Sequence, residues 1–286
     1  MLVVGATLFA FDAAAAQDSE GTEAPAPQVE SRIGIETTNQ YFFRGILQEN
    51  QGAIVQPSVD FVFPLWEGEN TSWSFNIGTW NSLHGGPTGS GGTGMSIYYE
   101  LDAYAGIGVD FAENWSGSVS YVVLSSPNSA FSMVQELDFS VSFDDSGVFG
   151  GDSSVFSGFQ PSVTVAWELD GQSDGGDDEG IYLEVGIEPA FDLIEDEILS
   201  VSASFPILAG LSLSNYFEDA TGSDDFFGFA QGGVSLSATL NFVPARLGSW
   251  TLSSGASILF LGDNLEAING GNSSEVILSL GLGVAF

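Results

Sequence analysis

The sequence predicts an all-β fold, a transmembrane antiparallel β-barrel of about 12 strands, and three observations lead to it. Apolar residues alternate with polar or small residues along twelve segments, which is the period of a strand with two different faces. Aromatic residues gather where these segments end, and the chain closes on Phe286 at the end of such a segment. A count of 14 strands is the alternative, and it requires one unrecognised strand within 144–157.

The composition removes several classes of protein. The 286 residues include 38 Asp and Glu against 3 Lys and Arg, a net charge of −35, yet 44% of the chain is hydrophobic. Nucleic-acid binding is excluded because it needs clustered basic residues, and disorder is excluded because the chain can bury ample apolar surface. With no Cys and a single His, His84, the sequence offers no thiolate metal site and little for His-based catalysis. We therefore expect neither an enzyme nor a cofactor.

The chain divides into three parts. Residues 1–16 are predicted to be a signal peptide, because an apolar run from Leu2 to Phe11 is followed by small residues ending at Ala16. No basic residue precedes the run, which a truncated or misassigned start would explain. Residues 17–31 are predicted to form a flexible polar periplasmic tail, and residues 32–286 the barrel.

The alternating segments are too long for a typical soluble sheet. The segment 97–111 exceeds both the roughly 5–6 residues usual in soluble strands and the roughly 9–11 needed to span a bilayer. We predict strands at 32–44, 53–63, 72–82, 97–111, 115–124, 133–143, 158–169, 181–191, 197–217, 226–242, 249–261 and 275–286. The segment 197–217 is kept whole, with an irregularity at Pro206, because splitting it would leave an odd number of strands.

Loops and turns then alternate between the two ends of the barrel. Outer loops are predicted at 45–52, 83–96, 125–132, 170–180, 218–225 and 262–274. Periplasmic turns are predicted at 64–71, 112–114, 144–157, 192–196 and 243–248. The segments FVFPLWEGENTSW and LNFVPARLGSW each place aromatic residues around a short turn, as interfacial belts do. These features favour a bacterial outer membrane, with lipid around the barrel and the Phe286 strand presented to the barrel assembly machinery.

The less apolar face of the strands predicts the lining of the lumen. The acidic residues on this face are Glu36, Asp60, Glu100, Asp102, Asp110, Glu136, Asp138, Glu168, Glu184 and Glu188. Neighbouring carboxylates roughly 7 Å apart repel by about 2.4 kcal/mol at an effective permittivity of 20. The lumen is therefore expected to be wet, or its acids to share protons or cations. Arg44 is expected at the outer end of the first strand, either as a constriction residue pairing lumenal carboxylates or as an interfacial residue closing the first hairpin.

Two further motifs are weak. The acidic loop with Asp170, Asp174, Asp177, Asp178 and Glu179 is dense in oxygen ligands but departs from the EF-hand pattern, so we interpret it as a solvated loop rather than a specific calcium site. His84 lies in a Gly-rich loop without an assignable nucleophile, which gives no ground for a catalytic role.

A family resemblance agrees with the barrel. The first strand reads Thr37-Thr38-Asn39-Gln40-Tyr41-Phe42-Phe43-Arg44-Gly45-Ile46, and the second contains Ala53-Ile54-Val55-Gln56-Pro57-Ser58. This aromatic-Arg-Gly-Ile step resembles the opening of the TorF-like porin family, and the stretches 161–168 and 182–186 and the closing Phe strand are also similar. The resemblance implies an outer-membrane barrel and a pore, without a named substrate.

The sequence thus leads to three functional hypotheses. The first is a porin that allows passive diffusion of small solutes, with a weak preference for cations set by the lumenal carboxylates. The second is a plugged structural or adhesive barrel without conductance. The third is a secreted soluble β-sandwich that binds carbohydrate.

Overall fold

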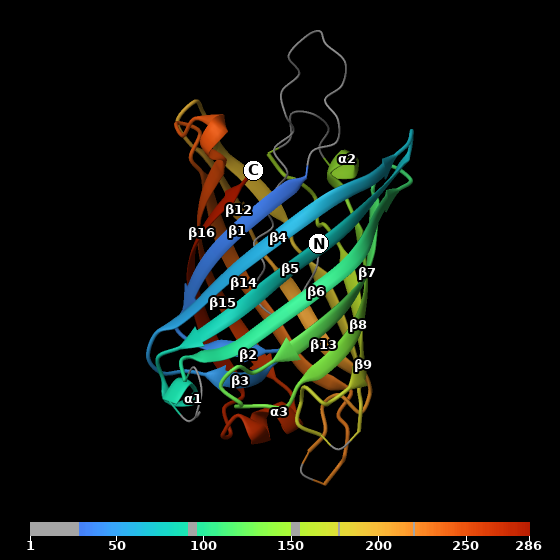
Figure 1. Cartoon of the computed structure of the whole chain (residues 1–286), viewed down its shortest axis with the longest axis vertical. Coiled ribbons are helices and arrows are strands. Elements are labelled where there is room, and N and C mark those ends of the chain that lie inside the picture. The colour runs from blue at the N-terminus through green and yellow to red at the C-terminus, as the bar shows by residue number, and fades with distance from the viewer. Residues whose placement is uncertain (1–28, 91–95, 150–154, 177, 220) are drawn as a thin grey trace.

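The computed structural model describes residues 29–90, 96–149, 155–176, 178–219 and 221–286. The predicted signal peptide, 1–16, and nearly all of the predicted tail, 17–31, lie outside these ranges. The described residues form one closed antiparallel barrel (Figure 1). The soluble sandwich is therefore ruled out as an architecture, because the sheet closes on itself through the pairing of β14 with β15.

Fourteen strands build the wall. They are β1 (Glu30–Thr38), β4 (Ile54–Glu67), β5 (Thr71–His84), β6 (Tyr98–Phe111), β7 (Trp115–Ser125), β8 (Val134–Phe143), β9 (Ser162–Asp170), β10 (Ile181–Ile187), β11 (Ala190–Glu195), β12 (Ser200–Ser204), β13 (Ile207–Ser214), β14 (Phe227–Thr239), β15 (Ser249–Leu261) and β16 (Ser274–Ala285). β10 with β11, and β12 with β13, are the halves of two interrupted strands. The described part of the chain thus forms twelve barrel strands, as predicted, and not fourteen.

Both interruptions occur at proline. β12 ends just before Phe205-Pro206 and β13 begins just after it, while β14 pairs with both halves. The amide of Gly233 still donates to the carbonyl of Pro206, and the amide of Phe205 to that of Pro189. Proline cannot donate to the ladder, so the strand kinks there and then continues. The predicted irregularity at Pro206 is confirmed.

The two ends of the barrel differ. β1 begins beside the end of β16, since Arg32 pairs with Ala285, and α2 (Ser146–Phe149) lies at the same end (Figure 1). Outer-membrane barrels keep both termini in the periplasm, so we call this the periplasmic end. α1 (Pro87–Ser90), α3 (Asp263–Ile268) and two short strands lie at the opposite, outer end. No helix in the described ranges is long and apolar enough to cross a bilayer.

The first predicted strand, 32–44, and the first predicted outer loop, 45–52, are wrong. β1 stops at Thr38, where the side chain of Asn39 bonds the backbone of Val276 and Leu278 in place of the ladder. The chain then forms an inward hairpin of β2 (Tyr41–Phe43) and β3 (Ile46–Glu49). Arg44 and Gly45, with φ of 46° and 84°, make the two-residue turn, the conformation that matches the twist of paired strands.

The connection predicted at 144–157 is longer than expected, because β9 begins only at Ser162. Three other periplasmic turns also differ from the prediction. β4 continues to Glu67 and β11 to Glu195, so the predicted turns 64–71 and 192–196 shrink to 68–70 and 196–199. Register shifts next to Pro64 and Asp192 let the strands pass irregular residues without ending. At the third turn β14 ends at Thr239, earlier than expected, and a 3-10 helix, η2 (Ala245–Leu247), lies in the connection to β15.

The outer surface of the wall is apolar and carries aromatic residues near its periplasmic rim. Ring contacts link Phe111, Trp115 and Phe143 on three neighbouring strands, with centroids 6.4 and 4.8 Å apart. The indoles of Trp66 and Trp73 are also exposed on the hairpin of β4 and β5. Closed barrels with such an exterior are the β structures that span membranes, because no backbone edge meets lipid.

Candidate functional site in the outer half of the lumen

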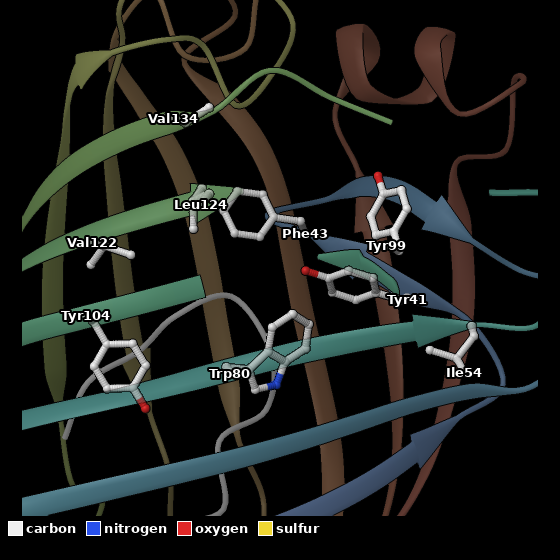
Figure 2. Close-up of a cluster of buried hydrophobic side chains, with 9 residues drawn as sticks. All are labelled: Tyr41, Phe43, Ile54, Trp80, Tyr99, Tyr104, Val122, Leu124 and Val134. Carbon is white, nitrogen blue, oxygen red and sulfur yellow. The ribbon is translucent and has the colours of Figure 1, made fainter. Parts of the chain in front are cut away.

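The β2–β3 hairpin packs against both sides of the outer half of the lumen. On one side Tyr41 and Phe43 contact a buried cluster of wall residues, in which the rings of Tyr41 and Trp80 lie 5.3 Å apart (Figure 2). On the other side Phe42 belongs to a second buried cluster with Tyr182 and Phe229. Because alternate residues of one short strand reach opposite walls, the hairpin fills the width of the lumen.

Loops of the outer end hold the hairpin in place. Asn269, directly after α3, accepts a hydrogen bond from the amide of Leu47 at 2.8 Å and donates one to the carbonyl of Gly45 at 2.7 Å. Tyr99 donates to the side chain of Gln48. The hairpin is thus attached to the wall and to the loop between β15 and β16.

A third attachment runs through His84. The Glu49 carboxylate accepts from the amide and the hydroxyl of Thr88, at 2.9 and 2.8 Å. The Thr88 oxygen lies 2.6 Å from Nδ1 of His84, and Nε2 of His84 lies 2.8 Å from the Ser82 hydroxyl. Since Glu49 can only accept, Thr88 donates to it, His84 Nδ1 donates to Thr88, and Ser82 donates to Nε2. Ser82 and His84 are fully buried, so this chain joins β3, α1 and β5 beneath the hairpin.

Hydrogen bonding also sets the charge of Glu49. Burial alone would raise the pKa of this carboxyl, but hydrogen bonds from Thr88, Gln51 and Asn50 outweigh burial and hold the pKa below its ordinary value. Glu49 is therefore an ionised anchor at the base of the hairpin.

Arg44, at the tip of the hairpin, is only 4% exposed and lies inside the lumen. Its Nη1 and Nη2 donate to Oε1 and Oε2 of Glu136 at 2.7 and 2.9 Å, and Nη1 also donates to the Tyr216 hydroxyl at 2.5 Å. The interfacial position considered from sequence is wrong, because the turn directs Arg44 inward. The pairing is bidentate, the geometry in which guanidinium and carboxylate bind each other most specifically.

Aromatic rings surround the same guanidinium. Its central carbon lies 4.6 Å from the ring centroid of Tyr182, 4.9 Å from that of Phe43 and 5.4 Å from that of Tyr216. Each ring lies within the range of a cation–π interaction, which is strongest when water is excluded. We call Glu136, Tyr182, Tyr216 and Phe43 the Arg44 cage.

The cage is linked to a second carboxylate. The hydroxyls of Tyr216 and Ser173 lie 2.8 Å apart, and Ser173 donates to Glu168 through both its hydroxyl and its amide. The amide of Gly180 donates to the other oxygen of Glu168 at 2.6 Å. Arg44 therefore contacts Glu136 directly and Glu168 through two hydroxyl groups.

All of the predicted lumenal acids lie on inward-facing positions, but at different depths. Five of them are buried in the outer half, namely Glu100, Asp102, Glu136, Asp138 and Glu168. Tyr182 donates to Glu184 at 2.7 Å, and Tyr104 donates to Asp60. Asp110 is exposed near the periplasmic rim, where Ser72 and Ser116 donate to it. Glu36 and Glu188 line a separate hollow beside the middle of β14 and β15, together with Gln231, Ser235, Ser257 and Ser279.

The part of the outer lumen that the hairpin fills, which we call the outer chamber, carries an excess of acidic groups. In the described part of the chain both carboxylate oxygens of Asp102, one of Glu100 and one of Asp138 are buried without a hydrogen-bond partner. Among the residues that the structure describes, Arg44 is the only basic side chain that faces this group. A buried carboxylate without a partner is costly, so the chamber favours the entry of positive charge.

Two acidic side chains of the loop 170–180 accept hydrogen bonds from other groups of the protein. Asp170 accepts from Gln135 at 2.9 Å, and Asp174 accepts from the amides of Gly176 and Glu218. Asp177 lies outside the described residues. Among the described residues no group of three or more His, Cys, Asp or Glu side chains could hold a metal ion.

The sequence prediction missed the aromatic members of the cage. Tyr182 shares the inward parity of Glu184, but from the sequence only the acidic residues of that face are assigned to the lumen. Tyr216 lies in a loop, where no period exists. Arg44-Gly45 between two apolar pairs was the available signal for a two-residue hairpin turn.

Comparisons with known proteins support the fold. No family profile and no curated protein sequence matches the chain. Among solved structures, the COG4313 outer membrane channel from Pseudomonas putida F1 aligns at a TM-score of 0.50 and 11% identity, over 94% of this chain and 100% of that one. LpxR from Salmonella typhimurium aligns at 0.48 and 10% identity, over 89% and 99%. A NanC porin structure aligns at 0.38 and 8% identity, over 90% and 99%. The chain is thus a β-barrel of the bacterial outer-membrane type, similar in fold to a channel.

Proposed function

We propose that the protein is a gated channel of the bacterial outer membrane that passes small solutes with a preference for cations. The observation that carries the proposal is that the barrel wall is complete without the hairpin. β1 and β4 pair continuously from Glu30 and Val62 to Thr38 and Ile54, so β2 and β3 are an insertion between two strands that already meet. The hairpin can therefore leave the lumen without breaking the wall.

The preference for cations rests on the charge of the lumen. Partly unpartnered carboxylates face the outer chamber, and Glu36 and Glu188 line the hollow beside β14 and β15. A low-dielectric wall around carboxylates focuses positive ions. The proposal includes no covalent chemistry, and the resemblance to the TorF-like porin family agrees with it. The strand that ends in Phe286 would be the signal for barrel assembly.

Conductance in planar bilayers tests the proposal. We expect the wild type to be mostly closed. A variant in which residues 40–52 are replaced by Gly-Ser-Gly should conduct steadily, because Thr38 and Ile54 are direct partners that a short loop can join. Its reversal potential in a KCl gradient should show cation preference. Anion preference in the variant would refute the selectivity.

Charge variants in the hairpin-free background locate the selectivity. Glu136→Gln with Asp138→Asn should move the reversal potential toward zero, since both carboxylates face the chamber. Asp192→Asn, on an exposed part of β11, is the matched control and should leave the reversal potential unchanged. Equal shifts in both variants would assign the preference to surface charge instead.

A plugged structural barrel is the second candidate. It is favoured by the attachments of the hairpin through Asn269, Tyr99 and the Glu49–Thr88 contact. Under this alternative the hairpin-free variant folds, shows heat-modifiable gel migration, and still does not conduct.

A further inference from the structure

The head group of Arg44 is held as a bound ligand would be held. It is almost fully buried, donates to both oxygens of the Glu136 carboxylate and to the Tyr216 hydroxyl, and lies against three aromatic rings. These contacts satisfy the guanidinium by shape, by charge and by hydrogen bonding together. Such a set is characteristic of recognition sites for organic cations.

The site belongs mostly to the wall and not to the hairpin. Glu136 lies on β8 and Tyr182 on β10, while Tyr216 follows β13. Ala166, which is fully buried, lies between Asp138 and Tyr182 in the register of neighbouring strands, so no bulky side chain separates the acidic and aromatic parts of the wall. The hairpin supplies only Arg44 and one ring, Phe43. When the hairpin leaves, a carboxylate and two aromatic rings remain.

The geometry discriminates between cations. A planar guanidinium can donate to both oxygens of Glu136 at once, whereas an ammonium group presents no parallel pair of donors. Inorganic cations do not find a ready set of ligands, because the described acids form no metal-binding group. The rings of Tyr182 and Tyr216 further favour a flat, weakly hydrated cation.

We infer that the wall part of the Arg44 cage is a recognition site for guanidinium-bearing organic solutes, and that Arg44 occupies it as an internal ligand while the outer mouth is closed. The role of the site in transport rests on the proposed channel function, but its chemistry does not. A solute with a guanidinium group competes with Arg44 for Glu136 and thereby favours the released hairpin.

Replacing the internal ligand tests the site. Arg44→Gly empties the cage and suits the backbone, because φ at this position is 46°, a conformation that glycine adopts readily. We expect millimolar methylguanidinium, well below denaturing concentrations, to raise the unfolding midpoint of this variant in a saturable manner. Methylammonium should bind at least about tenfold more weakly, since it lacks the parallel pair of N–H donors of a guanidinium.

Matched controls separate the cage from general salt effects. Arg32→Gly removes an arginine whose side chain is 35% exposed and pairs with Glu30, so methylguanidinium should not stabilise that variant. Arg44→Gly combined with Glu136→Gln should lose the response. If methylammonium acts as strongly as methylguanidinium, or if the response survives Glu136→Gln, the inference is overturned.

A second variant keeps the test decisive if Arg44→Gly does not fold. The hairpin-free variant leaves Glu136, Tyr182 and Tyr216 in place, and calorimetry in detergent should detect methylguanidinium binding that Glu136→Gln abolishes. Absence of binding there contradicts the inference. Because calorimetry requires no conductance, binding without ion flow would refute the channel and keep the site, whereas ion flow without binding would do the reverse.

Discussion

Arg44 and Glu136 form a bidentate ion pair between the tip of an inward hairpin and the barrel wall, although 92 residues separate them in the chain. Their side chains are 3% and 1% exposed. A pair this deeply buried has lost its hydration, so each group depends on the other for its counter-charge and its hydrogen bonds. The same pair fixes the hairpin across the lumen, and so links the stability of the barrel to the state of its mouth.

Removing one partner of this pair should be strongly destabilising. Glu136→Gln leaves the Arg44 guanidinium buried without its counter-ion, for which we expect a loss of about 3–5 kcal/mol in the free energy of unfolding. Denaturant unfolding in detergent measures it. Adding Arg44→Gln to Glu136→Gln should recover part of the loss, since no unpaired charge remains. A loss equal to the sum of the single variants would show that the pair is not coupled.

The turn of the hairpin depends on Gly45. Its φ is 84°, and a Cβ there would lie 2.5 Å from Cδ1 of Leu265. Gly45→Ala should therefore destabilise the protein by about 1–3 kcal/mol through backbone strain and the clash. Gly147→Ala is the control, because a Cβ at Gly147 would meet nothing within 4 Å. Similar unfolding midpoints for the two variants would contradict a hairpin whose turn packs tightly at Gly45.

Acidification should weaken the anchor at Glu49. Its pKa lies below the ordinary value because of hydrogen bonds from Thr88, Gln51 and Asn50, which outweigh the effect of burial. A depressed pKa contributes stability that is complete above the unfolded-state value, about 4.3, and is lost as the pH falls through the lower folded-state value. The midpoint difference between wild type and Glu49→Gln should thus be full at pH 7 and vanish in acid. A difference independent of pH would contradict this role.

Quenching by lipid should differ between Trp115 and Trp80. Trp115 is 42% exposed on the outer surface, whereas Trp80 is 6% exposed and lies in the lumenal cluster with Tyr41 (Figure 2). In vesicles of brominated lipid, a variant that retains only Trp115 should lose fluorescence. A variant that retains only Trp80 should not. Comparable quenching of Trp80 would mean that the inner and outer faces have been reversed.

The wall could be predicted because its signal is local. A period of two assigns Glu136 and Asp138 to one face and Phe139 and Val141 to the other, and barrel closure allows no other arrangement. The count of twelve also required the rule that such barrels have an even number of strands, which kept the segment around Pro206 whole.

The hairpin and the cage could not be predicted because their determinants are not local. Tyr41, Phe42 and Phe43 are all buried, so the alternation that identifies a wall strand disappears, and a continuous apolar run fits a wall strand or an internal plug equally well. The encounter of Arg44 with Glu136 depends on the closure of the whole barrel. No spacing in the sequence encodes it.

A reversible tether on the hairpin tests the central claim most directly. The chain has no Cys, so Leu47→Cys with Asn269→Cys introduces one thiol pair, at positions joined by a backbone-to-side-chain hydrogen bond. A short, cleavable linker between the thiols should keep the channel silent in a planar bilayer. Cleavage should start cation-selective conductance in the same molecules, because neither the linker nor the Asn269 side chain then holds the hairpin. Equal conductance before and after cleavage would contradict a mouth that opens by movement of the hairpin.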